Sequence, residues 1–314
     1  MDDSQRDDRL HVRQVREAVT GMLGRIIREV AGFYYVYSEE TGETVQCRAK
    51  GIFRKKGLRP SAGDLVEYSL TNTEDVEGSV DEILPRKNCL GRPPVANVDQ
   101  VLIVFAGKNP APNFLLCDKF LIMLDRKEIP AALCFNKADI TEEAAIGHFA
   151  EIYEKAGYPV FVTSAKLGEG KDALIGFLSG KLTAFAGPSG VGKSSLMNLI
   201  SGTDAAETGE VSKKTGQGKQ TTRASSIYVA GPSTYIIDTP GFGSLDLSDI
   251  EKEDLFLSFP EMASLAGRCR FSSCAHLKEP GCAVKEAVEA GTIAAERYEN
   301  YCSIYEELAA QKRY

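Results

Sequence analysis

A lysine and a serine follow a glycine-rich segment in the second half of the chain. Residues 187–195 read Gly-Pro-Ser-Gly-Val-Gly-Lys-Ser-Ser, which fits the spacing Gly-x4-Gly-Lys-Ser/Thr. Glycines at these positions permit a tight turn whose backbone N–H groups face an anion, and the start of a following helix adds positive charge. The segment therefore predicts a phosphate-binding loop, in which Lys193 meets the β- and γ-phosphates of a nucleotide and Ser194 meets Mg²⁺. Its members are Gly187, Pro188, Ser189, Gly190, Val191, Gly192, Lys193, Ser194 and Ser195.

The segments on either side give this loop the setting that it needs. Residues 181–187 form a short apolar run typical of a buried strand, and residues 195–200 open an apolar-periodic helix. A strand, a glycine turn and a helix in this order are the context in which such a loop binds phosphate. The alternative, a chance glycine-rich turn before a helix, does not account for the Lys-Ser pair together with both flanking elements.

Two further apolar runs end in residues suited to reading a base. Residues 133–139 end in Asn-Lys-x-Asp, where the Asp139 carboxylate can accept from N1–H and the exocyclic amine of guanine, a donor pair that adenine lacks. Residues 160–166 predict a second buried strand ending in Ser-Ala-Lys, whose backbone would meet guanine O6 while Lys166 covers the ring. Each pattern alone also fits a polar strand end, but together with the loop they indicate a guanine nucleotide. The residues expected around the base are Asn136, Lys137, Asp139, Ser164, Ala165 and Lys166.

A fourth segment completes the set expected of a GTPase. Residues 235–241 predict a strand ending in Asp-Thr-Pro-Gly, which would place Asp238 near Mg²⁺ and the Gly241 N–H near a γ-phosphate. Between the phosphate loop and this strand, residues 202–223 lack apolar periodicity, so we expect them to become ordered when nucleotide binds. Thr221 or Thr222, at the far end of this switch segment, would complete the Mg²⁺ shell, and the sequence does not distinguish between them.

The order of these motifs is unusual. Ordinary GTPases carry the phosphate loop first, then Asp-x-x-Gly, Asn-Lys-x-Asp and Ser-Ala-Lys, whereas here the two base-reading motifs come first. The chain therefore predicts a circularly permuted GTPase domain, which is feasible because strands and helices keep their packing when the cut lies in a surface loop. The permutation places Asp-Thr-Pro-Gly next to the C-terminal region, so a nucleotide-dependent movement would pass directly into it.

The C-terminal region contains four residues with metal-ligand spacing, in the order Cys-x4-Cys-x-His-x5-Cys. Three thiolates and one imidazole form a closed four-coordinate set that suits Zn²⁺ and leaves no position for water, so one structural zinc is predicted. The alternative is a group of reduced cysteines that lie close together by chance, which the crowding of three of the eight cysteines into one segment disfavours. The predicted ligands are Cys269, Cys274, His276 and Cys282.

Composition limits the class of protein. A chain of 314 residues suggests two or three domains, and 43% hydrophobic residues is ample for packed cores. The sequence has no apolar stretch of about 18 residues and no charged-then-apolar leader, so we expect a cytoplasmic monomer without a membrane span. The net charge of −7 argues against general nucleic-acid affinity, so any such binding requires a local basic patch.

Such a patch lies in the N-terminal part of the chain. After a charged tail, five β-rich runs over residues 23–30, 33–37, 43–49, 64–70 and 78–84 predict a small closed barrel of the OB type. Residues 48–60, from the end of the third run toward the fourth, carry six basic residues and no acidic one, which favours contact with an RNA backbone over a merely solvated loop. The nearby aromatics Phe33, Tyr34, Tyr35 and Tyr37 could add stacking, although alternate members must be core. The basic residues are Arg48, Lys50, Arg54, Lys55, Lys56 and Arg59.

These patterns predict an α/β P-loop GTPase domain, circularly permuted, between an all-β barrel and a helical zinc-binding domain. Strands alternating with helices from about residue 100 to 240 indicate an α/β sheet, and residues 85–94 form the linker that precedes it. The expected divisions are a tail or short helix over 1–21, the OB-fold RNA-binding domain over 22–85, the GTPase domain over 95–245 and the helical zinc-binding domain over 246–314.

This arrangement of motifs resembles the RsgA (YjeQ) family, the circularly permuted GTPases of bacterial small-subunit ribosome assembly. The resemblance covers about residues 22–310. It implies a GTPase that binds the small ribosomal subunit and its rRNA, is stimulated by the subunit and takes part in a late maturation step. Family members usually carry Arg-His-Thr-Thr in the switch, whereas this chain has Lys-Gln-Thr-Thr over residues 219–222, so a role that rests on the histidine does not transfer.

The residue after Asp-Thr-Pro-Gly bears on the mechanism. Many GTPases place a glutamine there to orient the attacking water, but this chain has Phe242, which cannot do so. We therefore expect slow hydrolysis of GTP alone, with water positioned by a switch group such as Gln220 or by the docked ribosomal partner. Two alternatives remain at this point: a non-catalytic, GTP-gated RNA-binding module and a P-loop kinase, the latter disfavoured by the guanine-reading pair.

Overall fold

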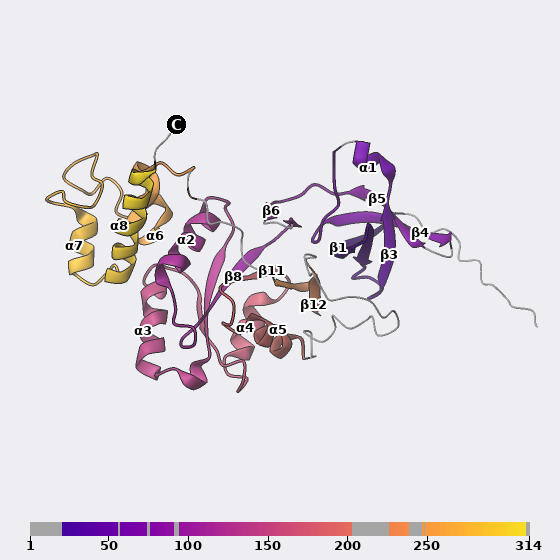
Figure 1. Ribbon diagram of the computed structural model, residues 1–314, viewed down its shortest axis with the longest axis horizontal. Helices are drawn as coiled ribbons and strands as arrows, with labels where there is room; N and C mark the ends of the chain where they lie inside the picture. Colours follow the sequence, from indigo (N-terminus) through magenta and orange to yellow (C-terminus); the bar gives the residue numbers. More distant parts are fainter. Residues whose placement is uncertain are drawn as a thin grey trace, which may run out of the picture.

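The computed structural model describes residues 21–55, 57–73, 76–90, 94–202, 226–238, 247 and 249–311. A β-barrel, a central sheet flanked by helices and a C-terminal group of helices follow one another along the long axis of the molecule (Figure 1). The expected N-terminal tail lies outside the described residues.

The N-terminal body is a closed five-stranded barrel. The strands are joined in the order β1-β2-β3-β5-β4, so β1 and β4 also pair and leave no free sheet edge. The predicted barrel is therefore confirmed. Side chains alternate along each strand, and the inward set, which includes Ile26, Val36, Cys47, Val66 and Val80, forms the core. The strands are β1 (Met22–Val30), β2 (Phe33–Tyr37), β3 (Thr44–Ala49), β4 (Leu65–Thr73) and β5 (Val76–Ile83).

Two features of the barrel differ from a simple alternation of strands and turns. The basic segment, which starts at the end of β3 and runs toward β4, contains a short helix, α1 (Gly51–Lys55), whose Phe53 is buried against the barrel core. The chain after β5 is held to the barrel rather than extending freely from it, since Arg86 forms two hydrogen bonds, of 2.6 and 2.7 Å, with the fully buried Asp64. A small hairpin of β6 (Cys89–Leu90) and β7 (Val95–Ala96) follows.

The central sheet has six strands in the order β10-β9-β8-β11-β13-β12. Neighbouring strands are parallel except β12, which runs antiparallel to β13. The strand before the phosphate loop, β11, lies in the middle of the sheet although three of the other strands precede it in the chain, as a permuted order requires. The strands are β8 (Gln100–Ala106), β9 (Ala131–Asn136), β10 (Val160–Val162), β11 (Leu182–Ala186), β12 (Ile227–Gly231) and β13 (Thr234–Asp238).

Helices cover both faces of this sheet. One face packs on α2 (Phe114–Asp125) and α3 (Glu143–Glu154), and the other on α4 (Lys171–Leu178) and α5 (Lys193–Ser201). All seven residues of β8 are buried because the strand is covered on both sides. The strand expected to be buried at residues 160–162 instead forms the sheet edge, where its side chains are half-buried or exposed.

The C-terminal body consists of helices packed around an apolar cluster. It contains the 3-10 helix η3 (Lys252–Ser258) and the α-helices α6 (Pro260–Ala263), α7 (Ala283–Glu289) and α8 (Ala295–Ala310). Ile122 of α2 belongs to the same cluster, so the C-terminal helices pack directly against a helix that covers the central sheet. The chain between α6 and α7 is irregular and carries the predicted metal ligands. Within the described ranges, no helix is both long and apolar enough to cross a membrane.

Candidate guanine-nucleotide and metal sites

The ends of the parallel strands bring the three predicted nucleotide-binding segments together. Asn136, at the end of β9, is buried, and its Nδ2 donates to the Val191 carbonyl of the phosphate loop at 2.9 Å. Its Oδ1 accepts from the Ala165 N–H at 3.0 Å and from the Thr163 hydroxyl at 3.2 Å. One amide side chain thus fixes the phosphate loop against the Ser-Ala-Lys segment.

A cavity of about 590 Å³ opens beside this contact. Asp139 lies on its wall, where one carboxylate oxygen accepts from the Ser164 hydroxyl at 2.9 Å and the other lies 3.8 Å from the Lys166 ammonium. A carboxylate held in this way presents acceptors to a ring that carries two adjacent donors. The lining residues are Asn136, Lys137, Asp139, Ile140, Ala165, Lys166, Gly192 and Ser195.

Lys137 connects this cavity to the phosphate loop. It has left-handed backbone geometry, with φ of 64°, and its ammonium donates to the Gly190 carbonyl at 2.6 Å and to the Asn109 carbonyl. Asn109 belongs to the segment between β8 and α2 and was not predicted as part of the site. The sequence could not indicate this contact, because it is made by the backbone carbonyl of Asn109, which only the tertiary fold places beside Lys137.

The phosphate loop surrounds a second cavity, of about 780 Å³, which shares Lys137, Gly192 and Ser195 with the first. Two of its glycines are required by close approach of other atoms. A Cβ on Gly187 would lie 2.1 Å from the Val104 carbonyl oxygen, and one on Gly192 would lie 2.3 Å from Asn136 Nδ2. Lys193 begins α5 and donates to the Gly187 and Pro188 carbonyls at 2.9 and 3.1 Å.

Asp238 faces the same cavity from the end of β13. Its backbone pairs with Phe185 of β11, which places the carboxylate beside the phosphate loop. Oδ1 is buried and has no hydrogen-bond partner among the described residues. Burial raises the pKa of this carboxyl, and the Lys193 ammonium opposes the rise. A buried carboxylate oxygen without a donor fits a hard cation such as Mg²⁺, which binds through carboxylates, waters and phosphate oxygens.

Several predicted site residues cannot be placed. Gln220, Thr221, Thr222 and Gly241 lie outside the described residues, as does Phe242. Their roles in binding Mg²⁺ and positioning water stay predictions.

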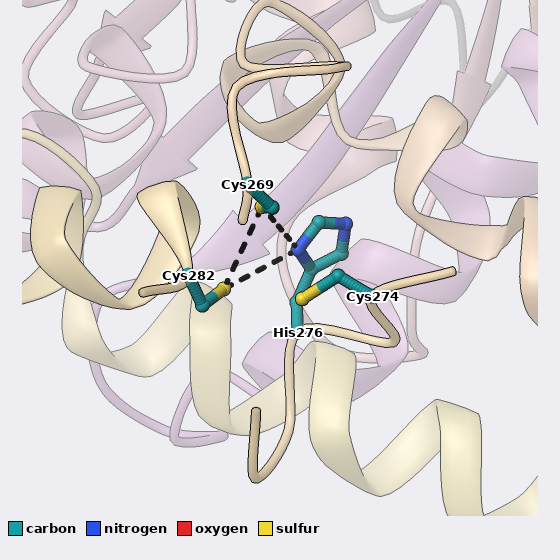
Figure 2. A group of neighbouring side chains, drawn as sticks. All are labelled: Cys269, Cys274, His276 and Cys282. Atoms are coloured by element: carbon teal, nitrogen blue, oxygen red, sulfur yellow. Dashed lines mark hydrogen bonds between the residues drawn. The ribbon is translucent and has the colours of Figure 1, made fainter. Parts of the chain in front are cut away.

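The four predicted metal ligands converge in the C-terminal body, where their ligand atoms lie within 4.8 Å of one another (Figure 2). His276 Nδ1 lies 3.5 Å from Cys269 Sγ and 3.4 Å from Cys282 Sγ, and the two sulfurs are 4.0 Å apart. A tetrahedral Zn²⁺ with Zn–S bonds of about 2.3 Å holds sulfurs roughly 3.8 Å apart. The donor set and its dimensions therefore fit zinc.

The surrounding chain fixes the ligands in this arrangement. The Arg270 N–H donates to the Gly281 carbonyl at 2.9 Å. This bond links the residue after Cys269 to the residue before Cys282. The Glu279 carboxylate accepts from three backbone N–H groups in the turn around His276, and the hydroxyls of Tyr298 and Tyr301 on α8 donate to carbonyls in the same turn. Burial raises the pKa of the Cys274 thiol to about 12, and a bound cation would favour the thiolate form of this ligand.

The basic segment of the barrel is only partly available for contact. Lys50 pairs with Asp81 at 2.9 Å, and Arg59 pairs with Glu29 at 2.6 Å. Arg48 lies over the Phe33 ring, with its guanidinium carbon 4.7 Å from the ring centroid. The side chains of Arg54 and Lys55, and all of Lys56, lie outside what the structure describes.

Comparison with known families identifies two regions of the chain. Residues 83–248 match the family described as RsgA GTPase, and residues 23–78 match the RsgA N-terminal domain. The chain is 46% identical over 302 residues to "Small ribosomal subunit biogenesis GTPase RsgA" of Agathobacter rectalis, covering 93% of this chain and 100% of the relative. It is 44% identical to the protein of the same name from Caldanaerobacter subterraneus, covering 92% and 97%.

Solved structures agree with the sequence matches. The structure of YjeQ from Thermotoga maritima superposes with a TM-score of 0.75 at 38% identity, covering 94% of this chain and all of that one. YloQ, described as a circularly permuted GTPase, gives a TM-score of 0.75 at 35% identity, covering 99% and 100%. The motif order, the sheet topology and these matches lead to one conclusion: the chain belongs to the RsgA family of GTPases.

Proposed function

We propose that this protein hydrolyses GTP while it assists late maturation of the small ribosomal subunit, and that docking on the subunit accelerates hydrolysis. The observation that carries the proposal is the convergence of the phosphate loop, Asn-Lys-x-Asp, Ser-Ala-Lys and Asp238 on two joined cavities. The relatives named above are described as GTPases of small-subunit biogenesis, which supports both the reaction and the partner.

Guanine would occupy the smaller cavity. Asp139 would accept from N1–H and the exocyclic amine, the Ala165 backbone would lie near O6, and the Lys166 stem would cover the ring. Asn136 would hold the site together through its bonds to Val191, Thr163 and Ala165, and the second N–H of its amide would be left to donate to the base.

The phosphates would occupy the larger cavity. Lys193 would exchange its two loop carbonyls for β- and γ-phosphate oxygens, and the backbone N–H groups of the loop would hold the same oxygens. Ser194 and Asp238 would bind Mg²⁺ directly or through water, with Thr221 or Thr222 joining in the GTP state. When bound, Mg²⁺ offsets charge that develops on the transferred phosphoryl group.

The reaction requires a water molecule positioned in line with the γ-phosphate. Phe242 occupies the position where many GTPases have glutamine, so this chain lacks that water-orienting group. Gln220 of the switch segment is the candidate within the chain, and Gly241 would donate its N–H to the γ-phosphate. We infer that the ribosomal partner orders the switch, which explains why hydrolysis would be slow without it.

Zinc would be structural. The four ligands Cys269, Cys274, His276 and Cys282 fill a tetrahedral shell, so no position remains for substrate or water. Its function would be to fold the irregular chain between α6 and α7.

The partner would be the small subunit and its rRNA, reached in part through the basic segment of the barrel, and the protein would act as a cytoplasmic monomer. The test is co-sedimentation with purified ribosomal subunits in the presence of a non-hydrolysable GTP analogue or GDP. The proposal predicts pelleting with small but not large subunits, and more with the analogue than with GDP. Equal pelleting with both subunits, or none with either, would contradict it.

A further inference from the structure

Thr141 closes the turn that carries Asp139. The turn begins at Lys137 and continues through the 3-10 helix η1 (Ala138–Ile140), where the Ile140 N–H donates to the Lys137 carbonyl at 3.2 Å. The Thr141 hydroxyl donates to the same carbonyl at 2.8 Å. The carboxylate that would read the base thus lies on a turn whose two ends are joined by one hydroxyl group.

The backbone of Lys137 needs this support. Its φ of 64° and ψ of 40° are left-handed, a conformation that is disfavoured for any residue with a Cβ. Such a residue keeps this geometry only where the surrounding bonds hold it. Here the ammonium donates to the carbonyls of Gly190 and Asn109, while the Lys137 carbonyl accepts from Thr141. Loss of the Thr141 hydroxyl would let the turn relax, and Asp139 would move with it.

A second contact holds the Thr141 side chain itself. Gly107, directly after β8, is buried, and its N–H donates to the Asn136 carbonyl at 2.9 Å. A Cβ on Gly107 would lie 2.5 Å from Thr141 Oγ1, 2.7 Å from Cγ2 and 3.0 Å from Cβ. Threonine is branched at Cβ and has few rotamers, so it could not turn away from such an atom and keep its bond to Lys137. The Thr141 side chain, and not a left-handed backbone, therefore requires glycine at this position.

We propose that Thr141 is a positioning residue for guanine recognition, which with Gly107 fixes the turn so that the Asp139 carboxylate meets N1–H and the exocyclic amine together. The inference rests on the proposed function, which places guanine against Asp139. Two hydrogen bonds to one ring require correct distances and angles at the same time, because hydrogen bonds weaken steeply when they are misaligned. The Ser164 hydroxyl holds one oxygen of the carboxylate at 2.9 Å, but it does not hold the backbone of the turn. Among the described residues, those that line the two cavities do not include Thr141, so it acts through the turn and does not touch the nucleotide.

The bond to Lys137 also leads toward the phosphate loop, because the Lys137 ammonium donates to the Gly190 carbonyl at 2.6 Å. The two routes predict different results with different bases. Hypoxanthine has N1–H but lacks the exocyclic amine, so inosine diphosphate would form only one of the two bonds to Asp139 while carrying the same diphosphate as GDP. A displaced Asp139 should therefore weaken GDP more than inosine diphosphate, whereas a displaced phosphate loop should weaken both equally.

Isothermal titration of Thr141→Val with GDP and with inosine diphosphate separates these routes. Valine keeps the branched shape against Gly107 and removes only the hydroxyl bond. Affinity for GDP should fall about tenfold, as expected when a carbonyl acceptor loses its partner, and affinity for inosine diphosphate should fall less. Thr141→Ser keeps the hydroxyl and should bind both nucleotides like the parent. The matched control is Ser303→Ala on α8, which removes the same kind of bond, from a hydroxyl to the carbonyl of Glu299 four residues earlier, and should change neither affinity.

Gly107→Ala tests the contact from the other side. Its Cβ would overlap the Thr141 side chain, so GDP binding should weaken. In Thr141→Ala the two nearest atoms, Oγ1 and Cγ2, are absent, so Gly107→Ala should cost less affinity when it is added to Thr141→Ala than when it is added to the parent. Losses that simply add would show that the two residues do not act together and would overturn their pairing.

The titrations also distinguish failure of this inference from failure of the proposed function. If Thr141→Val binds GDP like the parent, or loses affinity for GDP and inosine diphosphate by the same factor, Thr141 does not position Asp139 and the proposed function stands. If the parent binds GDP and inosine diphosphate equally well, Asp139 does not read the exocyclic amine. The proposed guanine site then fails, and this inference fails with it.

Discussion

The Arg297 guanidinium of α8 lies 2.5 Å from the Asp118 carboxylate of α2, and both side chains are almost completely buried. Arg297 also donates twice to Glu261 of α6, at 2.8 and 3.1 Å, and Asn300 donates to the second oxygen of Asp118. A buried charge with every partner satisfied positions the elements around it. This network joins the C-terminal helices to the helix that follows the Asn109 segment of the nucleotide site.

Removal of Arg297 should loosen the C-terminal body. Arg297→Met leaves the carboxylates of Asp118 and Glu261 buried without a cation, which costs about 3–5 kcal/mol. Arg297→Lys should restore little, because an ammonium cannot reproduce the forked contacts. Hydrogen exchange of the α8 amides measures the effect. The control is Glu307→Gln, which breaks the exposed pair with Lys119 and should cost at most about 1 kcal/mol. Equal protection of α8 in Arg297→Met and the parent would refute this role.

Base choice should depend on Asp139. In Asp139→Asn the acceptor that faces guanine N1–H becomes a donor, and each mismatched buried group costs about 1–3 kcal/mol. GTP affinity should therefore fall at least tenfold, while xanthosine triphosphate, which has a carbonyl in place of the exocyclic amine, should bind better than GTP. Isothermal titration with both nucleotides gives the answer. Unchanged affinity for GTP would show that Asp139 does not read the base.

Metal analysis of freshly purified protein should give one zinc per chain. Replacement of Cys274 and His276 together should remove it, and the segment between α6 and α7 should become sensitive to protease because part of its folding free energy comes from the metal. Cys302→Ser is the matched control, since this α8 cysteine packs in the same cluster but is not one of the four ligands. Protein without zinc that still resists protease would contradict the assignment.

The contact between barrel and sheet should depend on pH. Hydrogen bonds from Ser233 and Tyr235 lower the pKa of the Glu39 carboxyl. A carboxyl whose pKa is lower in the folded state than in the unfolded state stabilises the fold at pH values above its ordinary pKa of 4.5. This stabilisation is lost as the pH falls through the lowered pKa. The destabilisation caused by Glu39→Gln should therefore be measurable by urea unfolding at about pH 7 and should shrink as the pH falls below 4.5. The exposed neighbour Glu40→Gln serves as control, and a difference that stays constant with pH would exclude this linkage.

Local patterns in the sequence predict the architecture and the parts of the nucleotide and metal sites that lie in contiguous motifs. Alternating apolar residues predict the barrel strands, and each nucleotide-binding motif follows a strand of the central sheet, so its position at the carboxyl ends of the strands follows from the fold. The spacing of the metal ligands around Cys269 and His276 likewise predicts the metal site directly from the sequence. These are short-range signals, which a single chain reveals directly.

Long-range contacts are not predictable in this way. Asn109 contributes a backbone carbonyl that no side-chain pattern marks, and Arg297 is buried only because carboxylates from two other helices, Asp118 and Glu261, surround it. A buried arginine is rare unless paired, so its sequence position on α8 suggests an exposed residue. The edge position of β10 and the ion pair of Arg59 with Glu29 also depend on neighbours far along the chain.

Single-turnover hydrolysis of GTP, measured with and without purified small subunits, shows whether docking on the subunit accelerates the reaction. With Phe242 in the water-orienting position, the protein alone should hydrolyse slowly, and saturating small subunits should accelerate the step while large subunits should not. Replacement of Arg54, Lys55 and Lys56 by alanine should leave the basal rate unchanged and reduce the acceleration. A rate that is the same at every concentration of small subunits would show that the subunit does not stimulate hydrolysis.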